Sequence, residues 1–274
     1  MLESLLNMFS YQFMIRAGVV GLLVSLCAAL LGVSLVLKRY SMIGDGLSHV
    51  GFGSLAIASA LGLAPMAVSI PVVVLAAFLL LRLSGNGKLK GDALIAMIST
   101  SSLAVGVIAL SLSKGMTSDV NNYLFGSVLA MSESDVWLSV ALAAVVLSLF
   151  VVFYRKIFLV TFDETFARAT GEKVERYNML LAFLTAITIV LGMRVMGAML
   201  ISSLILFPAL TAMRVCRSFR SVILTSALVA VVCFFAGLVA SYLLATPTGA
   251  SVVVANLLAF LLFMAVGQMK KRIR

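Results

Sequence analysis

Long apolar runs separated by short charged or turn-rich breaks make up most of this chain. A transmembrane helix needs about 20 mainly apolar residues, and runs of that length repeat along the whole sequence. The pattern predicts an all-α fold, a polytopic membrane helix bundle that forms a single transmembrane domain over residues 1–274. We expect nine spans, at residues 13–37, 44–63, 65–83, 92–113, 133–153, 177–193, 195–213, 221–244 and 250–268.

The number of spans depends mainly on one pair of runs. Segments 177–193 and 195–213 are both short, and only Gly192, Met193 and Arg194 mark a turn between them. Eight spans with one re-entrant segment is therefore an alternative to nine.

The basic residues indicate how the bundle is oriented. Seventeen of the 20 Lys and Arg residues fall in alternate loops, and only Arg16, Lys114 and Arg194 fall on the other side. Because short cytoplasmic loops carry the excess of Lys and Arg, nine spans place the N-terminus outside and the C-terminus in the cytoplasm. The basic segments are Lys38–Arg39, 82–90, 155–176, 214–220 and 270–274.

The composition supports a membrane location and argues against several other classes of protein. Hydrophobic residues make up 63% and charged residues 11% of the chain, whereas a soluble domain has about 25% charged residues. The net charge of +10 is confined to loops, so it favours attraction to anionic lipid over binding of nucleic acid. The loops are too short for an ATPase domain, and no metalloprotease motif or complete phosphate-binding loop occurs, so we expect no enzyme activity.

The strongest chemical signal is Asp45 with the only histidine, His49. On a helix, residues four apart share a face, and a carboxylate with a neutral imidazole can bind a divalent transition metal. Ionisable groups within a membrane are costly and usually belong to a pathway or a partner. The alternative is a helix N-terminal charge at Asp45 and a packing role for His49. Four glycines in the same segment would let neighbouring helices approach closely: Gly44, Gly46, Gly51 and Gly53.

Two loops are longer than the rest. The outer loop, 113–127, contains Asp119, Asn121 and Asn122 and could cap or re-enter an ion pathway, or be an ordinary extracellular loop. Within the inner loop, about 154–176, a short cytoplasmic helix could be capped by Thr161 or Asp163. It could bind a soluble partner through an exposed aromatic face or lie flat on the headgroups. Its predicted residues are Phe162, Asp163, Phe166 and Ala169, with Gly171 ending it.

Two further residues are candidates for the pathway. Pro208 interrupts an apolar run, as helix breakers that line a pathway often do. Thr100 belongs to a polar group in the fourth span, Ser99 to Ser101.

Four segments resemble the membrane permeases of bacterial zinc and manganese uptake ABC transporters, and together they extend over nearly the whole chain. They are LVLKRYSMIGDGLSHVGFG (35–53), DVNNYLFGSVLA (119–130), MGAMLISSLILFPALTA (196–212) and TPTGASVVV (246–254). The resemblance implies a permease homodimer in the bacterial cell membrane, with two cytoplasmic ATP-binding subunits docked on the short helix and an extracellular or periplasmic metal-binding protein. It also matches Asp45 and His49 to the metal-binding positions of the second span.

Zn²⁺ or Mn²⁺ would then be a transported substrate, with no permanently bound cofactor. Some zinc-importing relatives carry a second histidine where this chain has Ser99 to Ser101, and an acidic residue where it has Ala245. A site with one imidazole and oxygen ligands could favour manganese, but the difference in ligand softness is too small to decide between the metals. We expect zinc as the preferred cargo, with manganese close behind. A secondary metal transporter that works without an ATPase, or a membrane scaffold, are the alternatives.

Overall fold

The computed structural model describes residues 10–86, 91–113, 124, 126, 132–198 and 200–272. Within these ranges all regular secondary structure is helical, which confirms the predicted all-α fold class. The helices are α2 (Gln12–Leu37), α3 (Ser41–Ala60), α4 (Pro65–Asn86), α5 (Gly91–Leu112), α7 (Glu133–Val152), α8 (Tyr154–Phe162), α9 (Glu164–Ala169), α10 (Val174–Met196), α11 (Ile201–Val215), α12 (Phe219–Leu244) and α13 (Thr248–Arg272).

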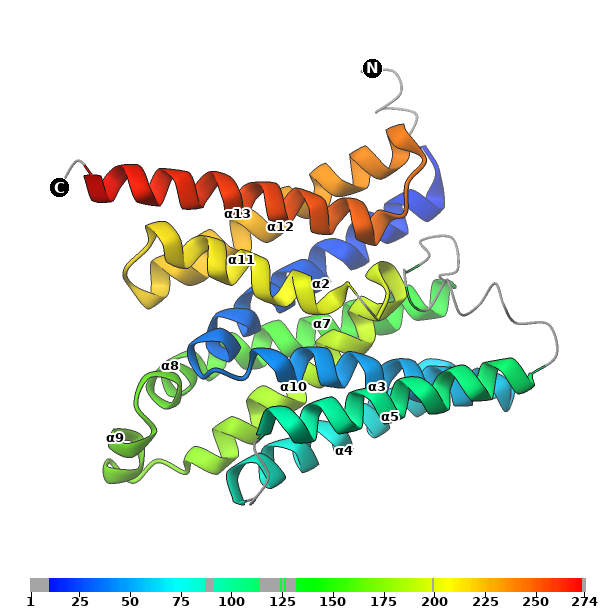
Figure 1. Cartoon of the computed structure of the whole chain (residues 1–274), viewed down its shortest axis with the longest axis horizontal. Coiled ribbons are helices and arrows are strands. Elements are labelled where there is room, and N and C mark those ends of the chain that lie inside the picture. Colours follow the sequence, from blue (N-terminus) through cyan, green and yellow to red (C-terminus); the bar gives the residue numbers. More distant parts are fainter. Residues whose placement is uncertain are drawn as a thin grey trace.

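A long helix occupies each of the nine predicted apolar runs, and all nine run between the same two ends of the molecule (Figure 1). Seven of them are long and apolar enough to cross a membrane. The other two are α3 and α11. Glycine, serine, Asp45 and His49 lower the hydropathy of α3, and α11 has only 15 residues.

The break between α10 and α11 lies later than the sequence predicts. Gly192, Met193 and Arg194 do not form a turn, because α10 continues through them to Met196. Gly197 then ends the helix with φ +85°, a left-handed conformation that glycine adopts without a steric penalty.

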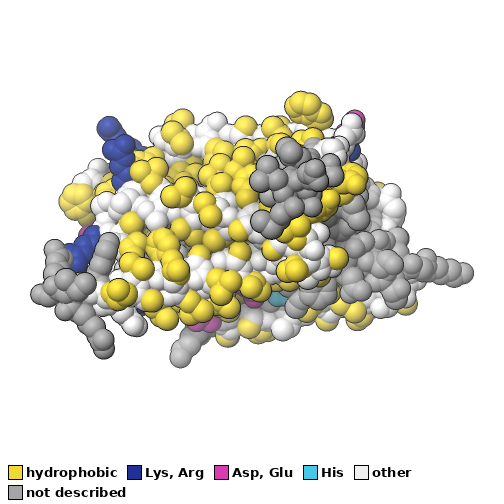
Figure 2. Space-filling view, turned by 90° about the horizontal axis from the view of Figure 1, so that it is seen from above, with side chains coloured by type: hydrophobic (Ala, Val, Ile, Leu, Met, Phe, Trp, Pro, Cys, Tyr) yellow, Lys and Arg dark blue, Asp and Glu magenta, His cyan; other side chains and the backbone are white. Residues whose placement is uncertain are grey.

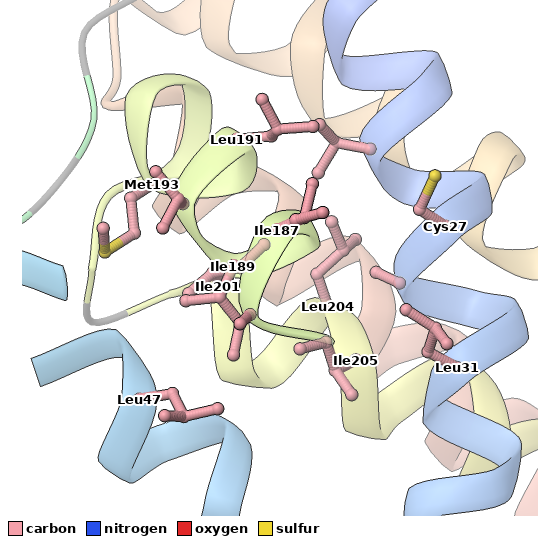
Figure 3. Packing of buried hydrophobic residues seen from close by; sticks show 14 of the residues in the cluster. Cys27, Leu31, Leu47, Ile187, Ile189, Leu191, Met193, Ile201, Leu204 and Ile205 are labelled. Carbon is pink, nitrogen blue, oxygen red and sulfur yellow. The ribbon is translucent and has the colours of Figure 1, made fainter. Parts of the chain in front are cut away.

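The centre of the bundle is formed by α2, α10 and α11. Leu31 of α2 and Leu204 and Ile205 of α11 lie among the tightly packed apolar side chains of this region (Figure 3). Gly32 permits the close approach of α2 and α11, since a Cβ atom there would lie only 2.0 Å from the backbone oxygen of Ile205.

Apolar side chains also cover much of the outside (Figure 2), as expected where helices face lipid. In the most apolar 18-residue window of each helix, only 17% of the residues of α13 are buried, and 22% of the residues of α5 and of α7. Most Lys and Arg side chains in view in Figure 2 gather toward one end. It is the end at which α8, α9 and the C-terminus lie in Figure 1.

Candidate metal site

Asp45 and His49 lie on one face of α3, as their spacing predicts. The His49 Nε2 atom is 3.7 Å from the Asp45 Oδ2 atom. The side chain of Asp45 is 40% exposed and that of His49 is 15% exposed, so the carboxylate can be reached from outside the single chain. Because α3 begins at Ser41, Asp45 lies beyond the first turn, and the structure gives it no role as a helix cap.

Two polar atoms close to this part of α3 are buried without a hydrogen-bond partner among the described residues. They are Nδ1 of His49 and Oγ of Ser99 on α5. Ser99 packs against α3 at Gly46, the residue after Asp45, since a Cβ atom on Gly46 would lie 3.3 Å from its hydroxyl oxygen. Unpaired buried polar groups are costly and usually have a structural or functional explanation. The contact between α3 and α5 therefore provides a carboxylate, an imidazole and a free hydroxyl in one region.

One chain by itself offers few metal ligands. Among the described residues, no group of three or more His, Cys, Asp or Glu side chains could hold a metal ion. The pair Asp45 and His49 can contribute one oxygen and one nitrogen ligand, which suits an ion that binds transiently rather than a permanent metal centre.

Two of the other predicted pathway residues lie on helices other than α3. Thr100 is exposed on α5, and its hydroxyl donates to the backbone oxygen of Ala96, 2.9 Å away. Pro208 is buried inside α11. Asp119, Asn121 and Asn122 lie outside the described residues. Ser99, one residue before Thr100, is the side chain that the packing brings next to α3.

The predicted cytoplasmic helix is divided into two pieces. Phe162 is the last residue of α8, and Asp163 then caps α9 by accepting a hydrogen bond from the backbone N–H of Phe166 at 2.8 Å. Ala169 ends α9, and Gly171 follows with φ +84°. Of the two predicted caps, Asp163 is confirmed, whereas Thr161 lies inside α8. Phe162 and Phe166 therefore lie on two helices and not on one.

The exposed aromatic surface of this segment is present in the structure. Phe162 is 58% exposed and Phe166 is 55% exposed. Phe162 packs against Phe158 and against Phe219 at the start of α12, with ring centroids 4.9 Å and 5.6 Å apart. The exposed aromatic side chains are therefore held in place by ring contacts beneath them, at the end of the molecule where Lys and Arg gather.

Comparison with known proteins identifies the family. Residues 10–267 match the ABC 3 transport family. The chain belongs to this family. The chain is 29% identical to the manganese import system permease protein ScaB of Streptococcus gordonii, over 94% of this chain and 93% of that protein. It is also 29% identical to the high-affinity zinc uptake system membrane protein ZnuB of Haemophilus influenzae, over 92% of this chain and 97% of ZnuB.

A solved structure supports the same assignment. PsaBC from Streptococcus pneumoniae in complex with Fab matches with a TM-score of 0.87 and 29% identity, over 96% of this chain and 94% of that chain. Permeases of this family are translocation subunits, and ATP is hydrolysed by a separate partner. The chain is accordingly a multi-pass membrane permease and not an enzyme.

Proposed function

We propose that this chain is the membrane permease of an ATP-driven importer of divalent transition metal ions, and that Asp45 and His49 bind the ion during its passage. The observation that supports this most directly is the facing pair itself, 3.7 Å apart on a helix of low hydropathy within an apolar bundle. The relatives named for manganese and zinc import support the same class of cargo.

The proposed order of metal preference rests on the relative affinity of these ligand types for the two ions. Imidazole nitrogen and carboxylate oxygen accept both ions, but such sites generally bind Zn²⁺ more tightly than Mn²⁺. Zinc is therefore the preferred cargo in this proposal, with manganese next.

A homodimer would complete the site. Each chain supplies two ligands, and two chains that meet at this face would supply four. The 40% exposure of Asp45 in the single chain leaves its carboxylate accessible to a second copy.

The proposal also includes nine membrane crossings, with the N-terminus outside and the C-terminus in the cytoplasm. In addition to the seven apolar spans, α3 and α11 run between the same two ends of the bundle (Figure 1). The α2–α3 turn, the α8–α9 segment and the end of α13 lie together at the basic end, as the positive-inside rule requires of cytoplasmic segments.

The partners follow from this orientation. The exposed Phe162 and Phe166 would contact the cytoplasmic ATP-binding subunit, with Asp163, Ala169 and Gly171 shaping the segment. A metal-binding protein would deliver the ion at the opposite end, the side for which the sequence predicts the outer loop with Asp119, Asn121 and Asn122. Thr100 and Pro208 would be secondary to Asp45 and His49, because neither lies on their helix.

Uptake by the reconstituted complex tests the assignment. We expect Asp45→Asn and His49→Ala to lower uptake of radioactive Zn²⁺ and Mn²⁺ at least about tenfold. Mutation of residues that merely support metal ligands typically lowers metal affinity or activity about 10–100-fold, and each of these substitutions removes one of the two proposed ligands themselves. Asp92→Asn is the matched control, because Asp92 is an exposed carboxylate in the first turn of α5 and should leave uptake unchanged.

Two results would count against the proposal. Normal uptake by either variant would remove the metal site. Uptake by the permease alone, without ATP-binding subunits, would favour a secondary transporter.

A further inference from the structure

Lys38 is a buried lysine at the cytoplasmic end of α2. It is the C-cap residue of that helix, and its side chain is only 4% exposed. The ammonium group donates three hydrogen bonds, to the backbone oxygen of Val160 at 3.0 Å, to Oε1 of Glu164 at 2.5 Å and to Oδ1 of Asn178 at 2.7 Å. One side chain thus joins α2 to α8, α9 and α10.

The network around this ammonium group is complete. A lysine has three N–H donors, and each has an acceptor here. Asn178 also donates from Nδ2 to Oε1 of Glu164 at 3.2 Å, which ties α10 to α9. Burial lowers the pKa of Lys38, although the hydrogen bond and the charge of Glu164 act to raise it. Only the lysine of this pair is buried, and removal of Glu164 would leave the ammonium group with two of its three acceptors.

The same lysine immediately precedes the turn that leads into α3. Arg39 has φ +60°, and the backbone N–H of Tyr40 donates to the oxygen of Leu35 at 2.8 Å, which folds the chain back tightly. The Lys38 Nζ atom lies 5.7 Å from the centroid of the Tyr40 ring. Helix α3 begins at Ser41, the residue after Tyr40, and Asp45 follows one turn later. Movement of Lys38 would therefore be passed to the start of the helix that carries the metal ligands.

We propose that Lys38 is a positioning residue that transmits movement of the α8–α9 segment to α3, so that events at the cytoplasmic surface alter the position of Asp45 and His49. This inference rests on the proposed function for its consequence in metal transport. Its mechanical part, a fixed connection between the two segments, rests on the Lys38 contacts alone.

The chain contains a matched control for this role. Lys156 on α8 forms an ion pair with Glu172, which follows α9. Both residues belong to the 154–176 segment, so this pair stabilises the segment internally and does not reach α2. It resembles the Lys38–Glu164 pair in chemistry but connects nothing across the bundle.

The first test measures metal transported per ATP hydrolysed by the full complex in proteoliposomes, with radioactive Zn²⁺ and Mn²⁺ as probes. We expect Lys38→Met to lower this ratio about tenfold while ATP hydrolysis continues, because the contact that couples the two segments is lost. Lys156→Met should leave the ratio unchanged. Lys38→Met combined with Glu164→Gln should be no worse than Lys38→Met alone, because both changes break the same contact.

A distance measurement tests the mechanical part independently of transport. Spin labels at Met42 on α3 and Leu262 on α13, both exposed, would report movement of α3 on addition of ATP. We expect a distance change in the wild-type and Lys156→Met complexes and none in Lys38→Met. If Lys38→Met does not assemble, Glu164→Gln provides the same comparison, because it preserves the size of the side chain.

The outcomes separate the two proposals. A wild-type transport ratio and a wild-type distance change in Lys38→Met, or in Glu164→Gln if it replaces that variant, would overturn the role of Lys38. If the wild-type complex takes up neither Zn²⁺ nor Mn²⁺ faster than the Asp45→Asn complex does, the proposed function is overturned. The distance measurement would still decide whether Lys38 connects the two segments.

Discussion

Helices α3 and α13 differ in a way that hydropathy alone does not reveal. Helix α13 is strongly apolar, and only 17% of its most apolar window is buried. Helix α3 contains an aspartate, a histidine and several glycines and serines, yet 13 of its 20 residues are buried. The more polar helix is therefore the more enclosed one.

The difference follows from what surrounds each helix. A helix that faces lipid must present apolar side chains all along its exposed surface, because lipid satisfies no polar group. A helix that faces other helices can carry small and polar residues, since packing and neighbouring groups support them. A hydropathy window therefore recognises α13 readily and misses α3, although α3 carries the candidate metal ligands.

The largest expected effect comes from moving a carboxylate between the two environments. Leu258 is 61% exposed on α13, and Leu258→Asp would place a charge toward lipid. Such a charge costs about 2.5–3.5 kcal/mol on insertion scales. We expect much less of this variant than of the wild-type chain in the membrane fraction, measured by quantitative immunoblot. Asp45 is the native counterpart, and equal amounts of variant and wild type would contradict the contrast between the helices.

An intermediate effect is expected at the close contact between α3 and α5. A Cβ atom on Gly53 would lie 2.6 Å from the backbone oxygen of Ser102, and backbone cannot move aside easily. We expect Gly53→Ala to lower the free energy of unfolding by about 1–3 kcal/mol, as overpacking usually does. Unfolding in detergent by titration with SDS would measure the loss.

The matched control for that substitution is Gly18→Ala in α2. Among the described residues, no atom outside the surrounding turns of α2 lies within 4 Å of a Cβ placed on Gly18, and alanine favours a helix, so stability should be unchanged or higher. Equal losses from both variants would show that close packing does not distinguish α3.

The smallest expected effect concerns the ion pair that holds the turn before α3. Burial acts to raise the pKa of the Glu164 carboxyl, but the hydrogen bond and charge of Lys38 outweigh it and hold that pKa below its usual range. The stabilisation is complete above the unfolded-state pKa and is lost as the pH falls through the lowered folded-state pKa. Because Glu164 is partly exposed, we expect a loss below about 1 kcal/mol on acidification.

Comparison of wild type with Glu164→Gln would isolate this contribution. Unfolding of the two proteins in detergent, followed from neutral pH to below the usual carboxyl range, should show acid sensitivity of this origin in the wild type only. The same acid dependence in both proteins would contradict it.

Much of the fold could be predicted from the sequence because lipid imposes a simple rule on it. Each apolar run that the pattern predicts is a helix, and the spacing of Asp45 and His49 correctly places them on one face. The end of α10 lies later in the chain than the sequence analysis predicted, because Gly197, and not Gly192, adopts the left-handed conformation. The Asp163 cap of α9 was predicted correctly, but the sequence did not show that Phe162 belongs to a separate helix, α8, which ends just before that cap.

The sequence by itself determined the helical class, the approximate helix positions and the placement of Asp45 and His49 on one helix face, because each depends on residues that are near one another along the chain. Only the tertiary structure decided that Ser99 rather than Thr100 packs beside α3, and that Lys38 contacts α8, α9 and α10. In the sequence, Lys38 looks like any basic residue at the inner end of a span. Its burial depends on Val160, Glu164 and Asn178, more than 120 residues away, which only folding brings to the end of α2.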